Sequence, residues 1–163
     1  MSQVQKLECG IYTMCLVQEG DKVLLLNRPD KLGFPGYLGP GGKVDFPESI
    51  TEGAIRELRE ETGLHVKPKD LIFKGMDGYV VPKTNYRYIV FNYLAQNYTG
   101  ELLDNPPEGE LAWIEVNEAL KLPMQPWFKR RFPLFFEEGT FDLSIVWDED
   151  TLSEVEERYF KLG

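Results

Sequence analysis

The chain has 163 residues and a formal net charge of −9, and apolar and charged residues make up 42% and 28% of it. This length favours one domain with a sizeable hydrophobic core, and the composition is that of an ordinary globular protein. Binding a nucleic acid polymer needs a basic surface, so the net charge argues against such a partner. A small phosphorylated ligand remains compatible, because bound cations can invert the sign of the local field.

The chain lacks the sequence features of an exported or membrane-spanning protein. No apolar run approaches the roughly 20 residues of a membrane span, which argues against a membrane partner. The first ten residues, MSQVQKLECG, lack the charged-then-apolar pattern of a secretory signal. Cys9 and Cys15 are therefore expected to be free thiols, and the cytoplasm is the expected location.

The first half of the chain predicts strands, a loop and one helix. Residues 8–17 and 22–27 are rich in apolar and β-branched types and are expected to pair as a hairpin. Residues 28–43 hold three prolines and five glycines, which predicts a loop with short extended pieces. Residues 48–62 carry one apolar stripe and are followed by Gly63, a pattern that predicts a helix with a glycine stop.

The second half predicts further strands and two more helices. Strands are expected at residues 70–81, 86–96 and 110–115, and helices at residues 116–121 and 125–137. The closing segment is expected to form two strands around a turn at Asp148, Glu149 and Asp150. Together these elements predict an α/β sandwich built on a mixed β-sheet.

The most informative chemistry lies in residues 48–61, which hold five glutamates and two arginines. Glu57, Glu60 and Glu61 stand at i, i+3 and i+4, so they share one face of the predicted helix. Three like charges so close repel one another, which indicates that cations offset them. Ligands that are all oxygen favour Mg²⁺ or Mn²⁺ over zinc.

A solvated acidic face is the alternative interpretation of such a helix. Two features weigh against it. The segment Gly39-Pro40-Gly41-Gly42 precedes the helix, and glycines allow backbone carbonyls to approach a metal. Arg56 lies about two helical turns after Glu48, where it can bridge neighbouring acids.

Residues 42–64 resemble the Nudix box, G-x5-E-x7-R-E-U-x-E-E-x-G-U, in which U is a bulky apolar residue. Every fixed position is filled, by Gly42, Glu48, Arg56, Glu57, Leu58, Glu60, Glu61, Gly63 and Leu64. The resemblance implies an α/β/α sandwich, formed by residues 1–163 as one Nudix hydrolase domain. It also implies an enzyme that hydrolyses a diphosphate linked to another moiety.

The resemblance implies roles for the acids of the box. Glu57, Glu60 and Glu61 would bind the metal, which is Mg²⁺ with Mn²⁺ as the alternative. The backbone carbonyl of Gly41 would be a further ligand. In many members another acid comes from a loop beyond the box, and here Glu108 is the candidate and Glu110 the second choice. Simple solvation of that loop is the alternative for both.

The catalytic residues implied by the resemblance are Glu60 and Glu61, with Arg56 and Glu48 in support. Arg56 would orient the glutamates by charge-assisted hydrogen bonds, and Glu48 would support the geometry between loop and helix. A glutamate with a raised pKa would take the proton from the attacking water. Glu60, Glu61 and Glu108 all remain open for this task.

Substrate-binding residues are expected mostly outside the box. Arg28 and Lys43 are candidates for contacting phosphates, with ordinary surface cations as the alternative. The chain is also similar, end to end, to the MutT-like hydrolases of oxidised purine nucleoside triphosphates. Tyr12 and Thr13 lie in the first strand, where the base pocket of that group begins.

The similarity to that group breaks down where the base is read. Leu38 and the pair Trp127-Phe128 hold places where the mammalian branch has hydrogen-bonding residues, so the base edge must be read differently. Trp127 and Leu38 are expected to line the base pocket, with helix core as the alternative for the tryptophan. Asn27 is a candidate for polar contacts, unless it only ends its strand.

The resemblance thus implies metal-dependent hydrolysis of a nucleoside triphosphate to the monophosphate and pyrophosphate, with oxidised purine nucleotides such as 8-oxo-dGTP as candidate substrates. The first alternative is hydrolysis of another nucleoside diphosphate derivative such as ADP-ribose. The second is a non-catalytic nucleotide-sensing module, which the complete set of box acids disfavours. Both a monomer and a homodimer remain open.

Overall fold

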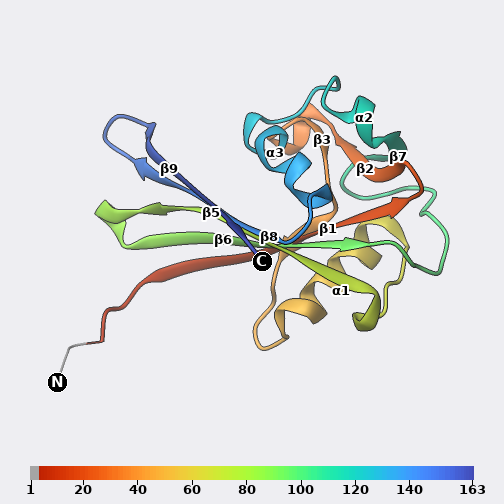
Figure 1. Cartoon of the computed structure of the whole chain (residues 1–163), viewed down its shortest axis with the longest axis horizontal. Coiled ribbons are helices and arrows are strands. Elements are labelled where there is room, and N and C mark those ends of the chain that lie inside the picture. The colour runs from red at the N-terminus through yellow and green to blue at the C-terminus, as the bar shows by residue number, and fades with distance from the viewer. Residues whose placement is uncertain (1–3) are drawn as a thin grey trace.

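The computed structural model describes residues 4–163 as a mixed sheet with helices on both faces (Figure 1). Its strands are β1 (Glu8–Glu19), β2 (Lys22–Arg28), β3 (Gly36–Leu38), β4 (Gly41–Lys43), β5 (Leu71–Val81), β6 (Tyr86–Ala95), β7 (Glu110–Glu115), β8 (Thr140–Asp148) and β9 (Ser153–Leu162). Its α-helices are α1 (Ile50–Thr62), α2 (Val116–Ala119) and α3 (Pro126–Arg131). The expected strands and the box helix are therefore present, close to their predicted limits.

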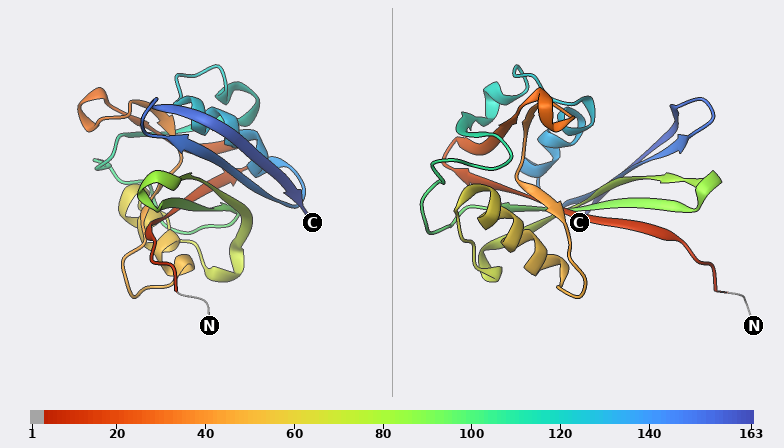
Figure 2. Two further views of the ribbon diagram at one scale, coloured as in Figure 1. Left: turned by 90° about the vertical axis from the view of Figure 1, so that its left-hand side faces the viewer. Right: turned by 180° about the vertical axis from the view of Figure 1, so that it is seen from behind.

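The main path of the sheet has the order β3-β2-β1-β6-β5-β8-β9, with β4 paired to β1 and β7 paired to β2. The pairs β1–β6 and β5–β8 are parallel and the others are antiparallel, so the sheet is mixed as predicted. The start of β1 and the hairpins β5–β6 and β8–β9 extend away from the helices as an arm (Figures 1 and 2).

The prediction of one helix over residues 125–137 is wrong in its extent. The α-helix α3 ends at Arg131, and a 3₁₀ turn covers Phe132–Phe136. Pro133 lacks a backbone N–H and its ring clashes with the carbonyl four residues earlier, so an α-helix cannot continue through it. Pro126 occupies the first turn of α3, where proline is tolerated.

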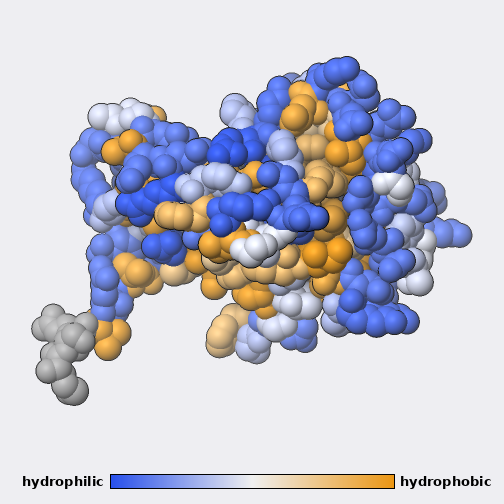
Figure 3. Space-filling model, in the orientation of Figure 1, coloured by the Kyte–Doolittle hydropathy of each residue, from blue (hydrophilic) through white to orange (hydrophobic). Residues whose placement is uncertain are grey.

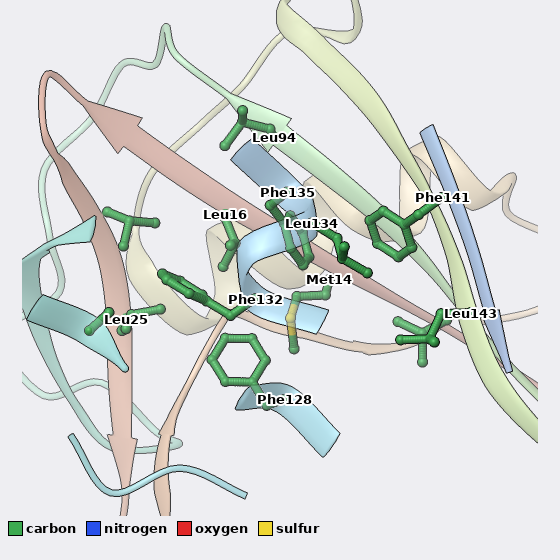
Figure 4. Close-up of a cluster of buried hydrophobic side chains, with 13 residues drawn as sticks. Met14, Leu16, Leu25, Leu94, Phe128, Phe132, Leu134, Phe135, Phe141 and Leu143 are labelled. Atoms are coloured by element: carbon green, nitrogen blue, oxygen red, sulfur yellow. The ribbon is translucent and has the colours of Figure 1, made fainter. Parts of the chain in front are cut away.

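Alternating residues of the central strands build two separate hydrophobic layers. Met14 and Leu16 of β1 belong to the layer beneath α3, whereas Cys15 and Val17 belong to the layer above α1. Figure 4 shows the first layer, in which aromatic side chains from α3 and its 3₁₀ turn pack on β1. Since the helices cover opposite faces of the sheet, the predicted α/β/α sandwich is confirmed.

The two cysteines differ in their exposure to solvent. Cys9 is exposed, Cys15 is buried, and both are free thiols as predicted. Burial raises the pKa of the Cys15 thiol to about 12, which makes that group unreactive.

The face seen in Figure 3 is mostly hydrophilic towards its periphery, and hydrophobic residues gather near its centre. Across residues 4–163, no helix combines the length and the apolar character needed to cross a membrane.

Candidate active site

The helix that carries the box acids has both of its ends defined by its own sequence. The Ser49 hydroxyl accepts a hydrogen bond from the Glu52 N–H at 3.1 Å, and the Glu52 carboxylate accepts one from the Ser49 N–H at 2.9 Å. This reciprocal pair is a capping box, which satisfies two backbone donors at the start of α1. Gly63 ends the helix with a φ of 87°, which glycine adopts at little cost.

Strand β4 lies against the acidic face of α1. The Gly41 N–H donates a hydrogen bond to the Glu61 carboxylate at 2.9 Å. A Cβ atom on Gly42 would lie 2.5 Å from the carboxyl carbon of Glu57, so a larger residue would displace that side chain. A Cβ atom on Gly41 would collide with the backbone carbonyl of Thr13 in β1. The two glycines therefore let the backbone of β4 lie directly against both carboxylates.

A cavity of about 390 Å³ opens beside these groups. At one part of its wall stand the carboxylates of Glu57, Glu61 and Glu108 and the guanidinium of Arg28. The Arg28 guanidinium lies 4.0 Å from the Glu108 carboxylate, which comes from the loop before β7. The structure thus brings the predicted loop acid into the same cavity as two acids of the box.

The environment of the two box acids disfavours their negative charges. Glu61 is only 8% exposed, and burial raises the pKa of its carboxyl group to about 8, helped by repulsion from Glu57 and Glu108. Burial also raises the pKa of Glu57, although the neighbouring Arg56 opposes this change. A cation placed between these carboxylates would offset both effects.

The donor set fits a hard divalent cation. The Glu61 carboxylate accepts a hydrogen bond from Gly41, the Glu57 carboxylate lies beside Gly42, and all four residues line the cavity. In the part of the chain that the structure describes, no three acidic, histidine or cysteine side chains form a ready-made metal cluster. Mg²⁺ usually takes one or two carboxylates and completes its shell with waters and substrate phosphates, so Glu57 and Glu61 would suffice as its carboxylate ligands.

Arg56 links the acids of the helix to the loop before it. Its guanidinium donates hydrogen bonds to Glu48 at 2.7 Å, to Glu57 at 3.0 Å, to Glu60 at 3.0 Å and to the Lys43 carbonyl at 3.0 Å. The pKa of Glu48 is lowered, mainly by its hydrogen bond from Arg56. The pKa of Arg56 is raised, mainly by the same contact. These bonds hold the Glu57 side chain in its position beside Gly42.

Glu60 occupies a different position from the other two acids. Its side chain is 54% exposed, is bonded to Arg56 and does not line the cavity in this conformation. Glu110, the second choice for the loop acid, lies in β7 opposite Asn27 of β2 and is exposed. Of the predicted acids, Glu57, Glu61 and Glu108 therefore share the cavity, whereas Glu60 and Glu110 lie outside it.

The predicted substrate residues also divide into two groups. Tyr12, Thr13, Arg28 and Leu38 line the cavity. The remaining three lie elsewhere: Asn27 is exposed on β2, Lys43 contributes its carbonyl to Arg56, and Trp127 lines a neighbouring groove and donates its indole N–H to Asp77 at 2.7 Å. Phe128 is buried in the hydrophobic core, and Trp127 is partly buried against the same core.

Sequence reasoning missed a buried ion pair behind the cavity. Arg131 lines the cavity and contacts Asp77 of β5 at 2.6 Å, and Asn92 of β6 donates a hydrogen bond to the same carboxylate at 2.7 Å. An acid within an otherwise strand-like segment was the available signal. Its partner lies 54 residues away in sequence, so only the fold could reveal the pair.

Comparisons of sequence and of fold find known proteins that are similar to this chain. Residues 10–135 match the family model described as the NUDIX domain. The uncharacterised Nudix hydrolase YvcI of Bacillus subtilis is 37% identical over 117 residues, a match covering 70% of this chain and 71% of that protein. The ADP-ribose pyrophosphatase of Methanocaldococcus jannaschii is 29% identical over 107 residues, a match covering 66% of this chain and 62% of that protein.

A solved structure extends the similarity over almost the whole fold. The crystal structure of a MutT protein from Bacillus halodurans matches with a TM-score of 0.77 and 32% identity, covering 92% of this chain and 97% of that one. The family match includes every position of the box and the strands around the cavity. Sequence, fold and family match therefore agree that this chain belongs to the Nudix family and is a pyrophosphohydrolase.

Proposed function

We propose that this protein hydrolyses a nucleoside triphosphate to the nucleoside monophosphate and pyrophosphate with the help of Mg²⁺. One observation carries the proposal: a single cavity joins the acids Glu57 and Glu61 to Arg28 and to the aromatic ring of Tyr12. The acids suit a metal, the arginine suits a phosphate and the ring suits a base. Nudix hydrolases in general use divalent metal ions and act on small nucleotides.

The residues around the cavity have distinct tasks in this reaction. Glu57, Glu61 and the Gly41 carbonyl would hold the metal, which supplies positive charge to the diphosphate and makes water a better nucleophile. Arg56 keeps Glu57 in place through a 3.0 Å hydrogen bond. Arg28, Glu61 and Glu108 line the same cavity. Arg28 would bind phosphate oxygens, and Glu61 or Glu108 would accept the proton of the attacking water.

Metal binding is expected to stabilise the folded protein. Titrating MgCl₂ or MnCl₂ into the protein, with no nucleotide present, should raise the melting temperature, because a ligand that binds only the folded state stabilises it. Differential scanning fluorimetry measures this effect without any need for activity. In Glu57→Gln the rise should be much smaller, and in Glu118→Gln, on the surface of α2, it should match the wild type. An equal rise in all three proteins would contradict the assignment.

A substrate panel tests the reaction itself. With Mg²⁺, the purified protein should release pyrophosphate from at least one of dGTP, dATP, dCTP, dTTP and 8-oxo-dGTP. Chromatography of the nucleotide product distinguishes the monophosphate expected here from a diphosphate. Release of orthophosphate alone would contradict the proposed cleavage site.

ADP-ribose is the second candidate substrate, because the named archaeal relative hydrolyses it. An ADP-ribose arm in the same panel decides between the two. Turnover of ADP-ribose well above that of every triphosphate would replace the first proposal with the second. We also propose that the protein acts in the cytoplasm, since two free cysteines suit a reducing compartment.

A further inference from the structure

Three residues that line the cavity each carry a buried polar atom that lacks a hydrogen-bond partner among residues 4–163. These atoms are Thr13 Oγ1, Arg28 Nε and Arg131 Nε. Buried donors and acceptors in folded proteins are almost always paired, because an unpaired one is costly. Three such atoms around one cavity therefore indicate that a polar ligand completes it. Arg28 lies beside Glu108, whereas Arg131 is paired with Asp77.

Arg131 is held by an acid that is itself fully engaged. The Asp77 carboxylate lies 2.6 Å from Nη1 of Arg131, and it also accepts hydrogen bonds from Trp127 and Asn92, each at 2.7 Å. Arg131 is 6% exposed and Asp77 is 2% exposed. Because the two opposite charges offset each other, this part of the cavity suits a neutral polar group better than a phosphate.

The free edge of the Arg131 guanidinium faces a weak acceptor. Its Nη2 atom lies 3.2 Å from the sulfur of Met14, and its Nε atom has no partner in the described part of the chain. These two nitrogens form the edge that donates two parallel N–H bonds. A thioether accepts hydrogen bonds poorly, and the unbranched methionine side chain moves aside easily. A ligand with two adjacent acceptors would therefore replace the sulfur at this edge.

We propose that Arg131 selects the base of the nucleotide by donating from Nε and Nη2 to two adjacent acceptors, and that the selected base is guanine. Guanine presents O6 and N7 side by side, a pattern that arginine binds with two hydrogen bonds. Adenine places an amino donor beside N7, so donor would face donor. In 8-oxoguanine N7 carries a hydrogen, which leaves one arginine donor unpaired. The proposal rests on the proposed nucleotide hydrolysis.

The remaining walls of the cavity suit a planar base. Tyr12 and Tyr88 both line it, and their ring centroids lie 4.7 Å apart. Aromatic side chains offer faces on which a base can stack, and this contact does not depend on the identity of the base. Base discrimination therefore falls to the polar edge of Arg131, and the tyrosines supply affinity.

The substitution Arg131→Lys tests this assignment. Lysine keeps a positive charge facing Asp77 but lacks the planar pair of donors. We expect the wild type to have a higher kcat/KM for dGTP than for dATP or 8-oxo-dGTP. In the variant, the ratio of kcat/KM for dGTP to kcat/KM for dATP should fall roughly 5- to 150-fold, mainly because the KM for dGTP rises. Arg130→Lys is the matched control, because Arg130 is bonded to Glu157 outside this cavity, and it should keep the wild-type ratio.

A binding measurement separates this inference from the proposed reaction. Without metal, dGMP should raise the melting temperature of the wild type more than dAMP does, and Arg131→Lys should lose the difference. If the protein hydrolyses no triphosphate but keeps this selective binding, the reaction is wrong and the role of Arg131 stands. The role of Arg131 would be overturned if Arg131→Lys weakened the binding of dGMP and dAMP equally. A wild-type preference for dATP or 8-oxo-dGTP over dGTP would also overturn it. If Arg131→Lys does not fold, the double variant Asp77→Asn with Arg131→Gln removes both charges together and carries the same expectation.

Discussion

Glu61→Gln should lower kcat by about a hundredfold or more while leaving the fold intact. The Glu61 carboxylate is buried beside the Gly41 N–H and lines the cavity. In that position it can bind a metal ion or accept a proton. Glutamine has almost the same shape and can still accept the hydrogen bond from Gly41, but it carries no charge. Steady-state release of pyrophosphate from the preferred nucleotide measures the loss.

The stability of Glu61→Gln distinguishes a lost function from a lost fold. Since the substitution removes a poorly solvated charge, the metal-free variant should melt at the same temperature as the wild type or higher. Glu118→Gln, on the surface of α2, provides the matched change at a site outside the cavity and should keep full activity. Wild-type kcat in Glu61→Gln would refute the role of this residue. Glu60→Gln belongs in the same series, because a comparable loss there would show that Glu60 turns into the cavity when metal and substrate bind.

Arg56→Lys should reduce activity by about 10- to 100-fold, because substitutions of residues that position metal ligands have effects of this size. Arg56 contacts Glu48, Glu57, Glu60 and the Lys43 carbonyl at the same time. A lysine ammonium is a compact charge with three donors and cannot reproduce this planar set. The Glu57 carboxylate should therefore become mobile, and the Mg²⁺ concentration needed for half-maximal activity should rise.

The dependence of activity on Mg²⁺ concentration would distinguish a positioning role of Arg56 from a role in stability alone. A role confined to stability would lower the melting temperature and leave the half-maximal Mg²⁺ concentration unchanged. Arg59→Lys is the matched control on the same helix, because Arg59 is exposed and forms no ion pair within residues 4–163. If Arg56→Lys and Arg59→Lys respond alike to Mg²⁺, the positioning role is wrong.

Local sequence patterns predicted most of the secondary structure because they follow short-range physics. The helix α1 has its cap at Ser49, its stop at Gly63 and an apolar stripe between them, and each depends only on neighbouring residues. The sequence predicts a longer helix than α3, because the apolar spacing of this segment continues past Pro133. There the missing N–H outweighs the hydrophobic pattern, and a 3₁₀ turn replaces the helix.

The candidate site could likewise be predicted only where it depends on the spacing of residues along one helix. The spacing of Glu57 and Glu61 on one helix face was readable from the sequence, because helical geometry relates residues four apart. It also placed Glu60 on that face, but the Arg56 contact draws this side chain away from the cavity in the present conformation. That contact depends on side-chain geometry around Arg56, which the spacing of residues does not describe.

The family, the reaction class and the helix that carries the acids could all be predicted from the amino-acid sequence, because they depend on contiguous residues whose spacing maps directly onto one helix. The surroundings of that helix could not be predicted in this way, because they depend on how the chain folds. The tertiary structure brought Glu108 and Arg28 to the acids, and it paired Arg131 with Asp77 behind the cavity. These contacts join residues far apart in the chain. They exist only because apolar side chains pack β1, β2, β6 and α3 together, and because β5 pairs with β6 in the same sheet.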